Sequence, residues 1–129
     1  MNYCINPYEQ KRLSTLEVIV GSLKLGAAHP IRVQSMTTAD TMDTTASVEE
    51  SIRMLAAGCE IVRLTAPSKN EAENLKIIKE ALLEKGYAQP LVADIHFTPN
   101  AAEIAALYVE KVRVNPGNYA DKKKFEDLV

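Results

Sequence analysis

The sequence of 129 residues is long enough for one domain with a single hydrophobic core. Its 47% hydrophobic and 25% charged residues are close to the average for globular proteins and argue against a disordered chain. The formal net charge of −2, without a dense basic stripe, argues against nucleic-acid binding.

The N-terminal part predicts a β-hairpin. Leu16–Val20 and Leu23–Leu25 are β-prone runs on either side of Gly21 and Ser22. Glycine as the first residue of a two-residue loop is typical of a type II′ turn. We therefore expect two short antiparallel strands here.

Two units of strand followed by helix come next. Ile31–Ser35 and Ile61–Thr65 predict strands, because they are short runs rich in β-branched and apolar residues. Ser47–Glu50 and Ser68–Glu71 have the spacing of capping boxes, so we expect helices to begin at Ser47 and Ser68. A glycine follows each predicted helix and supplies a left-handed end.

A third and a fourth unit follow the same pattern. Leu91–Ile95 and Lys111–Val114 predict strands, and Thr98 with Pro99 predicts the N-cap and first residue of the helix between them. The apolar residues expected on the core side of that helix are Ile104, Leu107 and Tyr108, and those that predict the start of a last helix are Phe125, Leu128 and Val129.

Alternating strands and helices at this spacing predict a parallel α/β fold with right-handed crossovers. Two architectures fit, an open doubly wound sheet and part of an eight-unit barrel. Met36–Asp40, after the first of these strands, contains no glycine and so lacks a phosphate loop, which favours the barrel. We predict the first half of a TIM-type barrel, with about four βα units in residues 28–129, preceded by a segment with a short β-hairpin in residues 1–27.

Polar residues stand at the carboxyl ends of three predicted strands, where the sites of parallel α/β proteins lie. They form pairs two residues apart, so each pair lies on one face of its strand. Two arginines without a surplus of acids indicate an anionic ligand, because guanidinium binds phosphate through two hydrogen bonds. The pairs are Arg63 with Thr65, Asp94 with His96, and Arg113 with Asn115.

Structural interpretations of these residues stay open. Arg63 could form an ion pair with Asp94 across neighbouring strands, and His96 could cap a helix or bond to a carbonyl. Asn115 begins an Asn-Pro-Gly-Asn segment that is chemically an ordinary turn. The histidines and cysteines have no metal-ligand spacing, so we expect no metal site in this chain.

The N-terminus and the cysteines favour a cytoplasmic protein. The first residues lack the basic and apolar regions of a secretion signal, and no apolar run approaches the ~20 residues that span a bilayer. Cys4 and Cys59 are too few for a disulfide scaffold.

Three motifs in order resemble those of one enzyme family. Pro30–Thr37, Pro90–Phe97 and Arg113–Asn118 are similar to segments of 4-hydroxy-3-methylbut-2-enyl diphosphate synthase, the iron–sulfur enzyme of the non-mevalonate isoprenoid pathway. The hairpin around Gly21 and the strand Ile61–Arg63 match as well. The resemblance extends from about Arg12 to Asn118.

The resemblance implies an N-terminal TIM barrel and a C-terminal domain with a [4Fe–4S] cluster. The family reductively opens 2-C-methyl-D-erythritol 2,4-cyclodiphosphate to the linear diphosphate, with electrons from ferredoxin or flavodoxin, usually as a homodimer. It implies that Arg63 and Arg113 bind the diphosphate, that Asp94 and Asn115 hydrogen-bond substrate oxygens, and that His96 lies in or next to this substrate-binding set.

The family's cluster ligands, three cysteines and a glutamate of the C-terminal domain, have no match in Cys4 or Cys59. We therefore expect no cluster bound to this chain and no turnover by it alone. A half-barrel leaves strand edges unpaired, which predicts self-association. Two alternatives remain open, a stand-alone anion-binding half-barrel and a pterin-binding barrel enzyme like dihydropteroate synthase.

Overall fold

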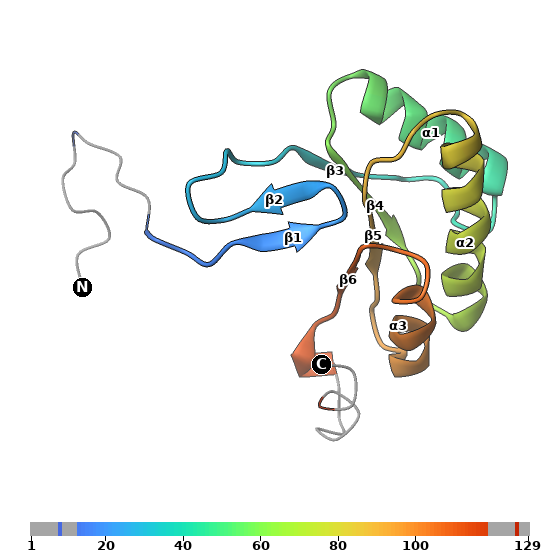
Figure 1. The fold of residues 1–129 in the computed structure, drawn as a ribbon. Helices are drawn as coiled ribbons and strands as arrows, with labels where there is room; N and C mark the ends of the chain where they lie inside the picture. Colours follow the sequence, from blue (N-terminus) through green and yellow to red (C-terminus); the bar gives the residue numbers. More distant parts are fainter. Residues whose placement is uncertain (1–7, 9–12, 119–125, 127–129) are drawn as a thin grey trace.

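The computed structural model describes Tyr8, residues 13–118 and Glu126. A two-stranded hairpin lies to one side of a four-stranded sheet, and the helices lie on the other side of that sheet (Figure 1). In the hairpin, β1 (Val18–Val20) pairs antiparallel with β2 (Leu23–Leu25). Gly21 has a φ of +58°, the left-handed value that the predicted turn requires at its first central position.

The four strands of the main sheet are parallel and follow one another in chain order. They are β3 (Gln34–Met36), β4 (Ile61–Thr65), β5 (Leu91–Asp94) and β6 (Lys111–Arg113). The predicted α/β class, the hairpin and the parallel sheet are therefore confirmed, and the arrangement is that of a partial barrel. The division into residues 1–27 and 28–129 stays a prediction.

Two strands are shorter at their start than predicted. β1 begins at Val18 rather than Leu16 because β2 ends at Leu25, the register partner of Val18. β3 begins at Gln34 rather than Ile31 because β4 begins at Ile61, the register partner of Gln34. The residues before Gln34 therefore have no strand beside them. The strands at β5 and β6 end one residue earlier than predicted.

Among the described residues, three helices cover one face of the sheet: α1 (Thr44–Ala56), α2 (Lys69–Glu84) and α3 (Pro99–Ala105). The alternate residues of β4 and β5 that face them are fully buried, and α2 contributes a buried stripe at helical spacing. This core includes Val62, Leu64, Leu91 and Ala93 of the strands and Leu75, Ile78 and Leu82 of α2. Within the part of the chain that the structure describes, no helix combines the length and the apolar character that spanning a membrane requires.

The start of α1 differs from the prediction. Asp43, not Ser47, is the N-cap, and its Oδ1 accepts a hydrogen bond from the Ala46 amide at 3.0 Å. Ser47 lies buried inside the helix and donates to the Asp40 carbonyl at 3.0 Å. An Asp one turn earlier offers the same capping chemistry, and here it takes the cap. The predicted capping box of Ser68 and Glu71 at α2 is confirmed.

The core side of α3 differs from the prediction in part, since Ile104 packs against the core as predicted but Leu107 does not. Small residues, Ala101, Ala102 and Ala105, are completely buried there, whereas Leu107 lies beyond the helix and is 74% exposed. Thr98 is the N-cap residue and Pro99 the first helical residue, as predicted, but the Thr98 hydroxyl makes no capping hydrogen bond and donates instead to the Pro67 carbonyl at 3.1 Å. The predicted last helix at Phe125, Leu128 and Val129 lies outside the described residues.

A glutamate immediately before β4 fastens the amino end of the sheet. Glu60 Oε2 accepts a hydrogen bond from the Val33 amide at 2.9 Å, and its Oε1 lies 2.9 Å from Arg32 Nη1. Glu60 therefore supplies a hydrogen-bond acceptor to the backbone just before β3, where the pairing of β3 with β4 has not yet begun.

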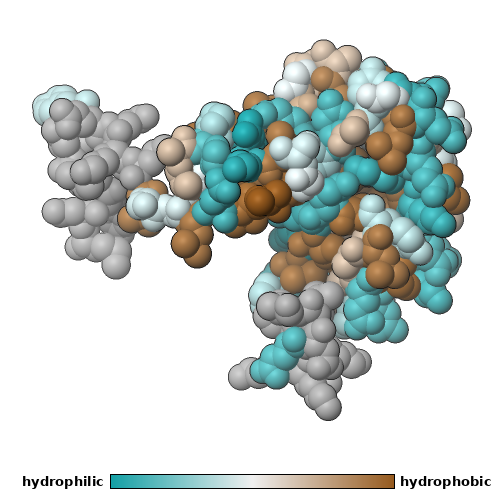
Figure 2. Space-filling model, in the orientation of Figure 1, coloured by the Kyte–Doolittle hydropathy of each residue, from teal (hydrophilic) through white to brown (hydrophobic). Residues whose placement is uncertain are grey.

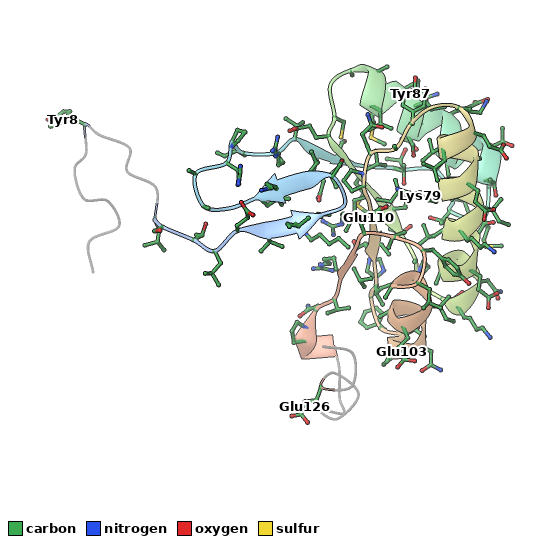
Figure 3. All side chains as sticks on the ribbon, in the orientation of Figure 1. Tyr8, Lys79, Tyr87, Glu103, Glu110 and Glu126 are labelled. Carbon is green, nitrogen blue, oxygen red and sulfur yellow. The ribbon has the colours of Figure 1, made fainter. Side chains whose placement is uncertain are left out.

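Glu110, immediately before β6, fastens the amino end of the sheet in the same way as Glu60. Its Oε2 accepts from the Leu91 amide at 2.8 Å, and its Oε1 lies 2.8 Å from Nζ of Lys79 on α2, whose side chain is only 12% exposed (Figure 3). The tip of the hairpin approaches the same side chain, since a Cβ on Gly21 would lie 3.0 Å from Glu110 Cγ. Glu110 thus connects β5, α2 and the hairpin.

The connection made by Glu110 predicts a stability effect. Glu110→Ala should lower the free energy of unfolding by about 1–3 kcal/mol, because it leaves the largely buried Lys79 ammonium without its carboxylate and the Leu91 amide without an acceptor. Glu103→Ala, at an exposed position on α3, is the matched control and should change it by less than about 0.5 kcal/mol. Urea denaturation of the two variants measures the difference, and equal values would contradict the role given to Glu110.

Candidate anion-binding site

Asp94 lies at the centre of the carboxyl edge of the sheet. It is the last residue of β5 and is 2% exposed. Its register partners are Thr65 of β4 and Arg113 of β6, so these three side chains share one face of the sheet. This face is opposite the helices, because Leu91 and Ala93 pack into the helical core.

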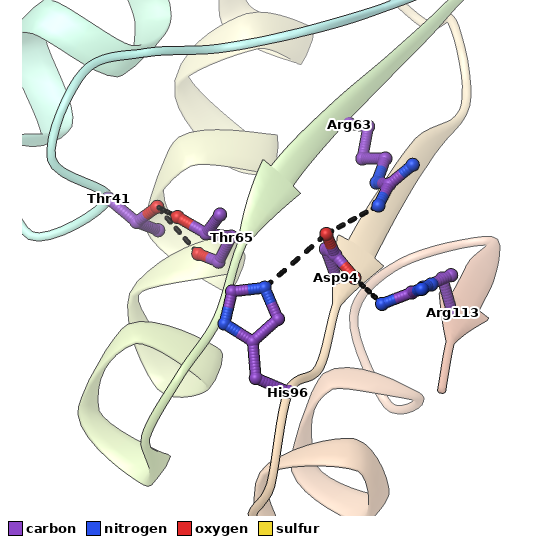
Figure 4. Close-up of polar contacts among 6 residues, drawn as sticks. All are labelled: Thr41, Arg63, Thr65, Asp94, His96 and Arg113. Carbon is purple, nitrogen blue, oxygen red and sulfur yellow. Dashed lines mark hydrogen bonds and ion pairs between the residues drawn. The ribbon is translucent and has the colours of Figure 1, made fainter. Parts of the chain in front are cut away.

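Each oxygen of the Asp94 carboxylate holds one arginine. Arg63 Nη2 of β4 lies 2.5 Å from Oδ2, and Arg113 Nη1 of β6 lies 3.1 Å from Oδ1 (Figure 4). The ion pair between Arg63 and Asp94 that the sequence left open is therefore present, and Arg113 joins it. The Arg63 side chain is 27% exposed and the Arg113 side chain 43%, so both guanidinium groups can be approached from solvent.

The charges of this group favour an anion. Burial raises the pKa of Asp94, but the hydrogen bonds and positive charges of Arg63 and then Arg113 outweigh it, so that this pKa lies below its ordinary value. Asp94 is therefore ionised at neutral pH. Two guanidinium charges against one carboxylate leave a surplus of one positive charge at the edge of the sheet.

His96 lies just beyond β5 on the same side as Asp94. Its Nε2 is 3.6 Å from Asp94 Oδ2, and its side chain is 40% exposed. The ring stands edge to face with Phe97, with 6.3 Å between the ring centroids. A protonated His96 would add a positive charge to the group.

Asn115 is not brought into this group of residues. It lies two residues beyond Arg113, is exposed, and its Oδ1 accepts a hydrogen bond from the Gly117 amide at 3.1 Å. That bond closes a local turn leading into a short 3-10 helix, Pro116–Asn118. The structure therefore unites Arg63, Asp94, His96 and Arg113 and leaves Asn115 in its own turn.

The loop between β3 and α1 borders the site. The Thr37 amide donates to the Arg63 carbonyl at 2.9 Å, and the Thr41 hydroxyl donates to the Thr65 carbonyl at 2.6 Å. Sequence reasoning missed this role of Thr41, because the role depends on a contact between residues 24 positions apart.

Glu50 of α1 occupies the backbone donors of the same loop. It accepts from the Thr38 and Ala39 amides at 3.0 and 2.9 Å and from the Thr38 hydroxyl at 2.9 Å. The hydrogen bond from the Ala39 amide contributes most to lowering the pKa of Glu50. The capping role predicted for Glu50 was wrong, and the loop amides that would otherwise suit a phosphate are used by this carboxylate.

The described residues do not fit a metal or an iron–sulfur cluster. In residues 13–118 with Tyr8 and Glu126, no three His, Cys, Asp or Glu side chains are placed to bind one metal ion. Cys59 is buried, and its thiol lies 3.0 Å from the Ile61 carbonyl, to which it donates. Cys4 lies outside the described residues.

Comparison with known proteins gives a consistent assignment. A family model described as the GcpE TIM-barrel domain matches residues 15–129. The 4-hydroxy-3-methylbut-2-en-1-yl diphosphate synthase (flavodoxin) of Akkermansia muciniphila is 54% identical over 125 residues, which are 97% of this chain and 21% of the relative. The protein of the same name from Leptospira interrogans is 54% identical over 127 residues, 97% of this chain and 19% of the relative.

A plant relative is also similar. The 4-hydroxy-3-methylbut-2-en-1-yl diphosphate synthase (ferredoxin), chloroplastic, of Oryza sativa subsp. japonica is 47% identical over 127 residues, which are 98% of this chain and 17% of the relative. The chain spans about a fifth of the length of the curated relatives it matches. These matches agree with the resemblance found in the sequence motifs and with the predicted partial barrel.

Proposed function

The chain belongs to the GcpE TIM-barrel family, and from that premise we propose that it is part of a 4-hydroxy-3-methylbut-2-enyl diphosphate synthase. In this function the whole protein is a cytoplasmic oxidoreductase that opens 2-C-methyl-D-erythritol 2,4-cyclodiphosphate to 4-hydroxy-3-methylbut-2-enyl diphosphate in isoprenoid biosynthesis. Its electrons come from flavodoxin or ferredoxin. The part played by this chain is to bind the diphosphate at the carboxyl edge of its sheet.

The pair of guanidinium groups on one buried carboxylate is the observation that carries the proposal. Each guanidinium has five N–H donors, and its bond to Asp94 uses one of them. Donors of Arg63 and Arg113 therefore remain for phosphate oxygens. Because Asp94 fixes the two groups before the ligand arrives, less side-chain freedom is lost on binding.

The remaining predicted residues have smaller roles in this proposal. Asp94 orients the arginines, and its own negative charge keeps it from contacting the diphosphate except through a ligand hydroxyl that donates to it. His96 adds positive charge when it is protonated. Asn115 keeps two amide donors beyond its turn, and these are the groups with which it would reach a substrate oxygen.

The reducing chemistry lies outside this chain in our proposal. A [4Fe–4S] cluster would pass on, one at a time, the two electrons that flavodoxin or ferredoxin provides, and the three cysteines and one glutamate that would hold it belong to the rest of the synthase. Among the described residues, β3 and β6 form the outer edges of the sheet, and apolar side chains remain exposed near the hairpin, including Ile19, Ile31 and Val33 (Figure 2). We propose that further barrel strands cover these edges, that the synthase is a homodimer, and that the isolated chain self-associates.

Inorganic pyrophosphate tests the binding role directly. Arg63→Gln and Arg113→Gln should each weaken its binding to the chain at least about tenfold, since a charge-assisted hydrogen bond contributes roughly 1.5–3 kcal/mol. Arg53→Gln removes the same charge at an exposed position of α1 and should leave the affinity within about twofold. Isothermal titration calorimetry of the four proteins measures these affinities. Equal affinities in all four would remove the arginines from the site.

The separation of binding from reduction gives a second prediction. The purified chain, supplied with the cyclic diphosphate and reduced ferredoxin, should form no linear diphosphate above the background without protein. Phosphorus NMR of the reaction mixture detects both compounds. Product formed in proportion to the amount of chain would show that these residues suffice for the reaction and would overturn the division of labour.

A further inference from the structure

Strands β4 and β6 carry the same short pattern of residues. Glu60–Thr65 reads Glu-Ile-Val-Arg-Leu-Thr, and Glu110–Asn115 reads Glu-Lys-Val-Arg-Val-Asn. The two strands lie on either side of β5, so the pattern flanks Asp94 from both directions. A shared pattern on two equivalent strands predicts that residues at the same position of the pattern have the same role.

The first and fourth positions of the pattern already agree in the structure. Glu60 and Glu110 each accept a backbone amide from the segment that begins the preceding strand, and each pairs with a cation. Arg63 and Arg113 each bond one oxygen of Asp94. The equivalence is therefore one of contacts as well as of sequence.

The last position of the pattern is Thr65 on β4 and Asn115 on β6. Thr65 is the register partner of Asp94 and lies on the same face as the two arginines, half-buried at the end of its strand. Asn115 uses its side-chain oxygen within its own turn. Of the two positions, Thr65 is therefore the one that the strand register places beside Asp94, and its hydroxyl is directed toward Thr41 (Figure 4).

Thr41 fixes the position of Thr65. Its side chain is 2% exposed, and its hydroxyl proton is committed to the Thr65 carbonyl at 2.6 Å. Its own carbonyl accepts a hydrogen bond from Asn74 Nδ2 of α2 at 2.7 Å, so α2 fixes the position of Thr41. The end of β4 is thus supported by a buried network rather than by solvent.

The Thr65 hydroxyl itself is only weakly bound. The two threonine hydroxyl oxygens are 3.4 Å apart (Figure 4), and because Thr41 donates elsewhere, Thr65 must be the donor in this contact. A contact of this length is near the limit of a hydrogen bond, so its proton can be turned to a stronger acceptor at little cost. A phosphate oxygen beside Arg63 would be such an acceptor.

We propose that Thr65 is a further ligand-contacting residue of this site, whose hydroxyl donates to a phosphate oxygen of a bound diphosphate. Thr41 is the positioning residue that holds Thr65 in place for this contact. The inference rests on the proposed binding of a diphosphate by Arg63 and Arg113, and it adds a neutral donor from the strand that carries Arg63.

The test compares variants of Thr65 in pyrophosphate titrations of the chain. Thr65→Val keeps the shape and removes the hydroxyl, and it should weaken binding about five- to tenfold, whereas Thr65→Ser should stay within about twofold of the parent. Thr45→Val, at an exposed position in the first turn of α1, makes the same chemical change away from the site and should have no effect. Urea denaturation confirms that each variant is folded.

A double-mutant cycle tests the positioning role. Thr41→Val should weaken pyrophosphate binding in the parent chain but add little in the Thr65→Val background, because its effect passes through Thr65. Fully additive losses would assign Thr41 a general structural role and overturn that part of the inference.

The outcomes separate this inference from the proposed function. If Thr65→Val binds pyrophosphate as tightly as Thr45→Val while Arg63→Gln has lost affinity, the role of Thr65 is overturned and the arginine site stands. If the parent chain itself does not bind pyrophosphate, both are overturned. Should Thr65→Val not fold, Thr65→Ala provides the same loss of the hydroxyl, with Thr45→Ala as its control.

Discussion

The carboxylate of Asp94 is the group on which the arrangement of the site depends. A carboxylate that is almost completely buried is costly unless cations and hydrogen bonds accompany it. Arg63 and Arg113 meet this need from the two neighbouring strands, one at each oxygen. The parallel register brings the three residues to one edge. The same contacts that stabilise the buried charge therefore hold two guanidinium groups where an anion can reach them.

The two ends of the sheet differ in how their charged side chains are used. At the amino end, Glu60 and Glu110 use their carboxylates on backbone amides and on cations of the chain itself. At the carboxyl end the positive charges outnumber the negative one, and the guanidinium groups remain partly exposed. This difference is the one expected of parallel barrels, whose binding groups gather at the carboxyl ends of the strands.

The sequence predicted what depends on local pattern and strand order. It predicted the four parallel strands, the hairpin and the position of the arginines beside Asp94, because alternation and strand ends are local features. It misplaced the start of α1, because Ser47 and Asp43 both have capping chemistry and only tertiary contacts decide between them. The turn of Asn115 and the contact of Thr41 with Thr65 depend on side-chain direction and on distant residues, which periodicity does not encode.

A carbon-13 NMR titration of the Asp94 carboxyl group measures whether the two arginines lower its pKa. We expect a midpoint below the ordinary pKa of 3.8 in the parent chain and a higher midpoint in Arg63→Gln, where one of the two cations that oppose the effect of burial is missing. A folded-state pKa below the unfolded value means that Asp94 contributes stability above the unfolded pKa and loses it as the pH falls through the folded one. A midpoint at or above 3.8 in the parent chain, or one that Arg63→Gln does not move, would show that the arginines do not stabilise the ionised Asp94.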